Sequence, residues 1–157
     1  MFDIIAAIIQ AVGNPVLVAF VLGFLPVSEV RGAAIYAFSV GQPWLIIPGA
    51  IGNILACPII LAIWDIVNIP FWGRLILGKR LEKRLLDFGK HYERQGLVAL
   101  TIFMGLPIPL TGVYTGTLIA ELFGIKRRYI LLTAVAGVAL AAIFLFFFLG
   151  GLKMVIG

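Results

Sequence analysis

The sequence predicts an all-α integral membrane protein made of two inverted repeats, each with a surface helix, a re-entrant helical hairpin and a transmembrane helix. Three observations support this fold class. Hydrophobic residues make up 62% of the 157 residues without counting glycine, whereas soluble domains contain about 45–50% with glycine included. Two apolar stretches are long enough to cross a bilayer, and two others are interrupted near their middle by Pro and Gly. Disordered chains, disulfide scaffolds and soluble enzymes are therefore excluded.

The two long apolar stretches predict transmembrane helices. A bilayer core of about 30 Å requires roughly 20 helical residues. The first stretch runs from about Trp44 to Ile69 and is interrupted only by Asn53, Pro58 and Asp65. The second runs from about Tyr129 to Leu149 and carries no charge. We expect each to cross the membrane once.

The two interrupted stretches predict re-entrant hairpins. Each contains two apolar arms of about 8–12 residues, or roughly 12–18 Å of helix, which is half the hydrocarbon thickness. We expect the arms at residues 15–25 and 33–40 in the first hairpin, and at residues 97–106 and 113–123 in the second. The residues expected to form the tips are Pro26, Ser28, Gly32, Pro107, Pro109 and Gly112.

The basic residues predict the topology. Most of the Lys and Arg residues lie in residues 74–94, and a second block lies at 126–128. Because short cytoplasmic loops collect Lys and Arg, we expect both blocks to be cytoplasmic. A second hairpin that enters and leaves on the cytoplasmic side satisfies this rule, and the first hairpin then opens to the exterior. The net charge of +5 is explained by topology, so we expect no nucleic-acid partner.

A short segment before each hairpin predicts a helix on the membrane surface. In Arg80–Gln95 the apolar residues recur on one stripe of a helix and the opposite face is charged. Met1–Val12 is the counterpart, although it is less amphipathic. The chain thus divides into a first repeat at 1–70 and a second at 71–157, which together form one structural domain. Inverted repeats of this kind are typical of transporters.

Two charged residues at the first tip are the leading candidates for a substrate or ion site. Glu29 and Arg31 fall near the membrane midplane, where a lone charge costs about 2.5–3.5 kcal/mol. Arg31 is suited to bind a phosphate or another anionic headgroup, and Glu29 is suited to carry a proton. The alternative is a structural pair, either between the two or with the opposite hairpin. Residues two apart do not face each other on a helix, but an unwound tip would bring them together.

The second tip offers hydroxyl groups instead of charges. Thr111, Tyr114 and Thr115 are candidate substrate contacts, and the arm after Gly112 begins with free N–H groups suited to an anion. Capping of freed backbone by the hydroxyls is the favoured interpretation, with Gly112 and Gly116 allowing close helix packing.

Few other residues suggest chemistry. Asp65 and Asn68 lie near the cytoplasmic end of the first span, where they line an exit path or, as we favour, cap the helix. Cys57 lies in an apolar run and is expected to be a packing residue. With one His, one Cys and no phosphate-binding loop, we expect no enzyme, no metal and no cofactor.

Both tips resemble one known family. Glu29-Val30-Arg31-Gly32-Ala33 resembles the Glu-x-Arg-Gly-Ala-Ile-Pro signature of the small multidrug export protein family. Residues 107–116 are similar to its Pro-x-Pro-Gly-Thr-Gly-Ala-aromatic-Thr-Gly signature. The sequence departs from these signatures at Ala34 and Ile35, which replace Ile-Pro, and at Leu110, which replaces Gly.

The resemblance implies a fold and a substrate class. The family is related to the DedA or VTT superfamily, whose members carry paired re-entrant hairpins and are linked to translocation of polyprenyl phosphate or phospholipid and to proton coupling. By position, Glu29 and Arg31 match the acidic and basic residues of the first signature, and Thr111 matches the polar position of the second. The family name itself implies drug export.

Three functions follow from these observations. The first is a flippase for an anionic or amphipathic lipid-type substrate, coupled to protons, which Arg31 favours. The second is a proton-coupled exporter of amphipathic drugs or cations, for which Glu29 and Asp65 are the candidate acids. The third is a non-transporting scaffold. We expect a multi-pass protein of a prokaryotic cytoplasmic membrane, and a homodimer, because two full spans shield buried charge poorly.

Overall fold

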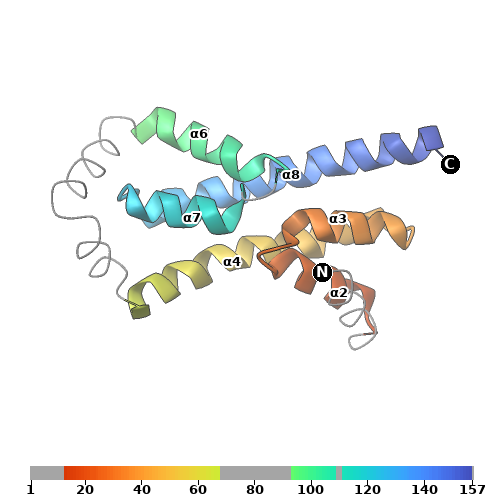
Figure 1. The fold of residues 1–157 in the computed structure, drawn as a ribbon, viewed down its shortest axis with the longest axis horizontal. Helices are drawn as coiled ribbons and strands as arrows, with labels where there is room; N and C mark the ends of the chain where they lie inside the picture. The colour runs from red at the N-terminus through yellow and green to blue at the C-terminus, as the bar shows by residue number, and fades with distance from the viewer. Residues whose placement is uncertain (1–12, 68–92, 109–110, 157) are drawn as a thin grey trace. The chain divides into compact units, whose positions relative to one another are not determined.

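The structure, a computed structural model, describes residues 13–67, 93–108 and 111–156, and every element in these ranges is helical (Figure 1). This confirms the all-α prediction for that part of the chain. The predicted surface helix at 1–12 lies outside the described residues, as does the one at 80–95 apart from its last three residues. In chain order the elements are α2 (Pro15–Phe24), α3 (Glu29–Ser39), the 3-10 helix η1 (Pro43–Leu45), α4 (Ile46–Val67), α6 (Glu93–Gly105), α7 (Val113–Leu122) and α8 (Arg127–Ile156).

Two helical segments are long and apolar enough to cross a membrane. The segment Pro43–Ile66, formed by η1 and α4, has 24 residues, and its most apolar stretch of 18 residues has a mean hydropathy of 2.2. The segment Arg127–Val155 in α8 has 29 residues, and its most apolar stretch of 18 residues has a mean hydropathy of 2.7. The first agrees with the predicted span. The second continues beyond the predicted end at Leu149, because Gly150 and Gly151 remain helical. Glycine costs a helix only about 1 kcal/mol relative to alanine, so two glycines need not end one.

The surface of these helices is apolar. Large hydrophobic side chains such as Ile66, Phe147 and Leu132 are more than half exposed. A water-soluble monomer rarely exposes apolar side chains on this scale, whereas a lipid-facing surface requires them. The exposed apolar residues therefore agree with the hydropathy of α4 and α8.

The first hairpin consists of α2 and α3, which pack against each other. The side-chain oxygen of Asn14 caps α2 by accepting a hydrogen bond of 2.9 Å from the backbone N–H of Val16. At the other end of the hairpin, Gly41 adopts a φ of +71°. The N–H of Gln42 then donates to the carbonyl of Ala37 at 2.9 Å, which is the Schellman pattern that ends a helix.

The second hairpin consists of α6 and α7 and ends in the same way. Gly124 adopts a φ of +68°, and the N–H of Ile125 donates to the carbonyl of Ala120 at 3.0 Å. The sequence predicted arms that end at residues 40 and 123, and the helix stops at Gly41 and Gly124 agree with these ends. Each of the two short-arm segments thus forms a pair of short helices joined by a turn.

The chain forms two compact units. One unit contains Met1–Leu55 and Val138–Gly157, so that it includes the first hairpin, the beginning of α4 and the second half of α8. Within it, Phe38 of α3 and Phe146 of α8 make an edge contact with ring centroids 6.1 Å apart. The other unit contains Ala56–Gly137 and includes the second hairpin, the end of α4 and the beginning of α8.

Small residues allow the first hairpin to pack closely on α4. A Cβ atom added at Gly23 of α2 would lie 1.9 Å from the carbonyl oxygen of Gly49. One added at Gly49 would lie 2.2 Å from the Cβ of Ala33 in α3, and one added at Gly52 would lie 2.2 Å from the carbonyl oxygen of Phe20. Helices that approach this closely inside a membrane gain dispersion contacts in place of hydrophobic burial.

The second hairpin also packs closely through small residues, which here lie against the side chain of Met104. A Cβ atom at Gly116 of α7 would lie 2.6 Å from the side chain of Met104 in α6. One at Gly137 of α8 would lie 2.7 Å from the Cβ of Met104. The prediction that Gly116 allows close packing is therefore confirmed.

These contacts predict which glycines tolerate a side chain. We expect Gly23→Ala and Gly49→Ala each to destabilise the protein by about 1–3 kcal/mol, because the backbone of Gly49 and the Cβ of Ala33, respectively, occupy the space that the methyl group needs. The measurement is thermal unfolding of the purified protein in detergent. The control is Gly151→Ala, which meets nothing within 4 Å and should be neutral or stabilising by up to about 1 kcal/mol. Equal melting temperatures for Gly49→Ala and Gly151→Ala would contradict the packing described above.

Candidate functional site

The charged residues of the first tip form an ion pair. The Nη2 atom of Arg31 donates to Oε2 of Glu29 at 3.0 Å, and the side chains are 18% and 7% exposed, respectively. Among the described residues, Glu29 is the one charged residue that is buried. A buried charge requires a partner because ionised groups lose much solvation free energy inside a protein. Arg31 supplies that partner and keeps more contact with the surroundings.

An unusual backbone conformation brings the two side chains together. Glu29 is the first residue of α3 and has a φ of +50°, which is the left-handed region. In the described part of the chain every other residue with a positive φ is a glycine. Such a conformation costs about 1–3 kcal/mol and persists where the surrounding structure holds it. On a regular helix the two side chains would not face each other, and one left-handed residue at the helix start is sufficient to bring them together.

Ser28 and Gly32 form the rest of this tip. The hydroxyl of Ser28 donates to the backbone carbonyl of Leu22, near the end of α2. A Cβ atom at Gly32 would lie only 2.5 Å from the Cβ of Ser28, so this position must lack a side chain. Pro26 lies in the exposed part of the turn. The turn is thus stabilised by Ser28, and the charged pair lies at the start of α3.

The second tip has a different chemistry. The Thr111 hydroxyl lies within hydrogen-bond distance of two backbone carbonyls, 2.9 Å from that of Leu106 and 2.8 Å from that of Ile108. This is a capping role. Pro107 and the buried Gly112 flank the turn, while Pro109 lies outside the described residues. The described residues of this tip carry no charge.

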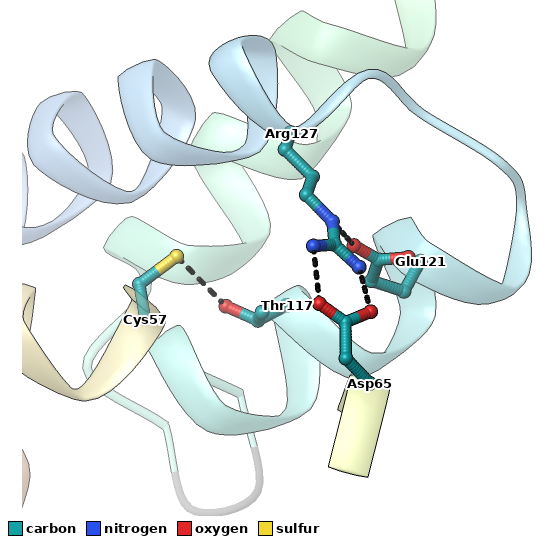
Figure 2. Close-up of polar contacts among 5 residues, drawn as sticks. All are labelled: Cys57, Asp65, Thr117, Glu121 and Arg127. Atoms are coloured by element: carbon teal, nitrogen blue, oxygen red, sulfur yellow. Dashed lines mark hydrogen bonds and ion pairs between the residues drawn. The ribbon is translucent and has the colours of Figure 1, made fainter. Parts of the chain in front are cut away.

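Three hydroxyl residues lie along α7 after this tip. Tyr114 and Thr115 are in its first turn and are half-buried. Thr117 is buried, and its hydroxyl donates to Sγ of Cys57 in α4 at 3.4 Å (Figure 2). Cys57 is fully buried, in keeping with the expected packing role.

A second charged cluster joins α4, α7 and α8 within the unit Ala56–Gly137 (Figure 2). Arg127 donates to both carboxylate oxygens of Asp65, from Nη1 at 2.7 Å and from Nη2 at 2.5 Å. Its Nε also donates to Oε1 of Glu121 at 2.9 Å. Asp65 therefore binds an arginine across the unit, whereas the sequence predicted that it caps its own helix or lines an exit path. Asn68 lies outside the described residues.

The sequence contains a signal for this cluster. Asp65 is the acidic residue at the end of the first span, and Arg127 is the middle residue of the basic segment before the second. The predicted topology places both at the same side of the membrane, so pairing was available to them. The side chains of Arg127 and Asp65 are about half exposed, and exposed ion pairs contribute little to stability in water. The fork geometry fixes the end of α4 beside the beginning of α8.

No group of three or more His, Cys, Asp or Glu side chains that could hold a metal ion occurs in residues 13–67, 93–108 and 111–156. What the first tip offers is an arginine held in place by a buried carboxylate. What the second cluster offers is a fixed junction between helices.

The pair at the first tip makes a testable prediction about stability. Arg31→Met leaves Glu29 buried without a partner, and Glu29→Gln leaves Arg31 without its carboxylate. We expect Arg31→Met to destabilise the protein by about 3–5 kcal/mol and the double variant to recover most of the loss. Thermal unfolding and the yield of monodisperse protein measure this. Additive losses in the double variant would show that the two side chains do not depend on each other.

Comparison with known proteins identifies the family. The family model described as "Putative small multi-drug export protein" matches residues 29–144. The match begins at Glu29 and includes the first tip from that residue onward, the second tip, α4 and more than half of α8. The comparison with curated proteins found no match, and neither did the comparison with solved structures. Because the family model covers well over half of the length of this chain, the chain belongs to the small multi-drug export protein family of membrane proteins.

Proposed function

We propose that this protein is a membrane transporter that binds an anionic, lipid-type amphipathic substrate at the tip of the first hairpin. The observation that carries this proposal is the ion pair in which Glu29 is the buried partner and Arg31 the more exposed one. A purely structural pair inside a membrane is an expensive arrangement. An arginine held by a carboxylate, with its remaining donors available, is suited to bind a phosphate group.

The number of N–H donors that Arg31 leaves unused favours an anionic substrate. A guanidinium has five N–H donors, and Arg31 uses one of them on Glu29, its hydrogen-bond partner in the described part of the chain. An anionic group can bind the other donors and leave this bond in place. A cation would have to compete with Arg31 for Glu29, whose side chain is only 7% exposed. The geometry therefore supports the anionic substrate over the cationic one.

Proton coupling is part of the proposal. A substrate anion that binds the other donors shares the guanidinium with Glu29, and so weakens the pairing of this buried carboxylate. Proton uptake by Glu29 would offset that loss, because a buried ionised carboxylate is costly without a full partner. Substrate and proton would then bind together, which is the simplest coupling that this pair allows.

Two alternatives have separate support. The family description favours an exporter of drugs, many of which are amphipathic cations, and Glu29 and Asp65 would be the acids that bind them. Both carboxylates, however, already bind arginines. A non-transporting scaffold would use the tip pair for stability alone. The double variant Glu29→Gln, Arg31→Met distinguishes a scaffold from a transporter, because a scaffold would keep its function once the fold is restored.

The membrane arrangement is also proposed. Both hairpins are re-entrant from opposite leaflets, in repeats 1–70 and 71–157, with segments 74–94 and 126–128 on the cytoplasmic side of a prokaryotic membrane. The bidentate pair of Asp65 and Arg127 supports this. It joins the end of the first span to the start of the second, as a hairpin that enters and leaves on one side requires. The wider relationship to the DedA or VTT superfamily, and assembly as a homodimer, belong to the same proposal.

Single cysteines at the hairpin ends test the topology. In a Cys57→Ala background, cysteines at Asn14 and Gln42 flank the first hairpin, and cysteines at Gln95 and Lys126 flank the second; all four native residues are exposed. We expect a membrane-impermeant thiol reagent to label the first two from outside intact cells and the last two only after lysis. If the members of either couple label from opposite sides, that hairpin crosses the membrane and is not re-entrant.

Substitution of Arg31 tests the substrate class. We expect Arg31→Lys to weaken binding of short-chain phosphatidylglycerol by about tenfold or more, because the planar fork is lost while the charge remains. Isothermal titration of purified protein in detergent measures this. Arg128→Lys is the matched control, since Arg128 is an exposed arginine that lies over the ring of Tyr129. Unchanged lipid affinity in Arg31→Lys, or binding of a hydrophobic quaternary ammonium in its place, would overturn the anionic assignment.

A further inference from the structure

A buried amide on α4 has an oxygen without a hydrogen bond. Asn53 is 2% exposed, and its Oδ1 atom has no hydrogen-bond partner among the described residues. Buried polar groups nearly always have a partner, because an unsatisfied one loses its solvation without compensation. A leucine here would avoid that loss. Asn53 therefore requires an explanation that packing does not supply.

The helix register places Asn53 at the level of the charged tip. α3 and η1 are joined by a short connection, so α3 and the start of α4 run in opposite directions (Figure 1). Ala33 and Gly49 face each other across this pair, since a Cβ atom at Gly49 would lie 2.2 Å from that of Ala33. One turn earlier on α3 is Glu29, and one turn later on α4 is Asn53. Residues four apart share a helix face, so Asn53 lies opposite Glu29.

Glu29 and Asn53 are distinctive in this unit because few of its other side chains are polar or charged. Within the described part of Met1–Leu55 and Val138–Gly157, the two buried polar side chains are Glu29 and Asn53. The charged side chains there are Glu29, Arg31 and Lys153, and Lys153 is exposed in the last turn of α8. The tip thus presents donors from Arg31 and a free acceptor from Asn53 at one level of the fold.

We propose that Asn53 contacts the substrate, and that its side-chain oxygen accepts a hydrogen bond from a hydroxyl or amine next to the anionic group bound by Arg31. This inference rests on the function proposed above and narrows its substrate class. The site takes an anionic amphiphile that also carries a donor, such as a phosphate diester with a glycerol headgroup. A diester with a plain alkyl headgroup would leave the Asn53 oxygen unpaired.

The expected selectivity follows from this unpaired oxygen. A site built to receive a hydrogen bond rejects an analogue that lacks the donor, because a buried polar group then remains unsatisfied. The discrimination for one such group is roughly five- to hundredfold in affinity. Proteins retain such groups at functional sites although they lower stability.

The experiment compares two short-chain lipids of equal charge. Dihexanoyl phosphatidylglycerol carries hydroxyls in its headgroup and dihexanoyl phosphatidylethanol carries none. We expect the purified wild-type protein to bind the first at least fivefold more tightly. Asn53→Leu should bind both with the affinity that the wild type shows for phosphatidylethanol, and without lipid it should melt at or above the wild-type temperature.

Two further variants keep the test decisive. Asn53→Ala removes the same oxygen without adding bulk, so the headgroup preference must vanish there even if the leucine does not fit. Thr133→Val is the control, because Thr133 is a buried threonine of the other unit whose hydroxyl donates to the carbonyl of Ile130. It should keep the preference of the wild type.

Each adverse outcome has its own meaning. Equal binding of the two lipids by the wild type, with both affinities reduced in Arg31→Lys, overturns the role of Asn53 and leaves the proposed function in place. A preference that survives in both Asn53 variants does the same. Binding of neither lipid overturns the proposed function together with this inference.

Discussion

A helix that turns back in an apolar environment leaves backbone carbonyls without partners, and the two hairpin tips depend on satisfying them. Each tip uses one hydroxyl side chain. Ser28 donates to the carbonyl of Leu22 at the first, and the hydroxyl of Thr111 lies within hydrogen-bond distance of the carbonyls of Leu106 and Ile108 at the second. Each unsatisfied carbonyl in hydrocarbon would cost several kcal/mol. With Ser28 and Thr111 committed to the backbone, the first tip differs from the second by its charged pair of Glu29 and Arg31.

Small residues allow the helices beside the first tip to pack closely on one another. Gly23, Gly49 and Ala33 allow α2, α3 and the start of α4 to approach until backbone and Cβ atoms are in contact. Two consequences follow from the same contacts. They set the register that places Asn53 opposite Glu29, and they leave no room for side chains that would separate these residues. The packing and the site thus depend on the same few positions.

Much of this arrangement could be predicted from the sequence, and the failures have physical causes. Helix stops at Gly41 and Gly124 were predictable because a left-handed position strongly favours glycine. The meeting of Glu29 with Arg31 was foreseen only for an unwound tip, since no rule of local sequence assigns a left-handed conformation to a glutamate. The level of Asn53 depends on the register of two helices in contact, which hydropathy does not contain. Asp65 and Arg127 are far apart in the chain. Their pairing could be predicted only from the predicted topology, which places both residues at the same side of the membrane.

The cluster around Arg127 also affects the net charge of the basic segment 126–128, which matters during membrane insertion. During insertion, the orienting effect of a loop depends on its Lys and Arg residues, and acidic residues contribute little. In the folded protein, two carboxylates offset most of the charge of the three consecutive basic residues, because Asp65 and Glu121 both bind Arg127. Arg128 lies over the ring of Tyr129. The segment therefore carries its full basic charge while the chain is nascent, and most of that charge is offset once the helices have assembled.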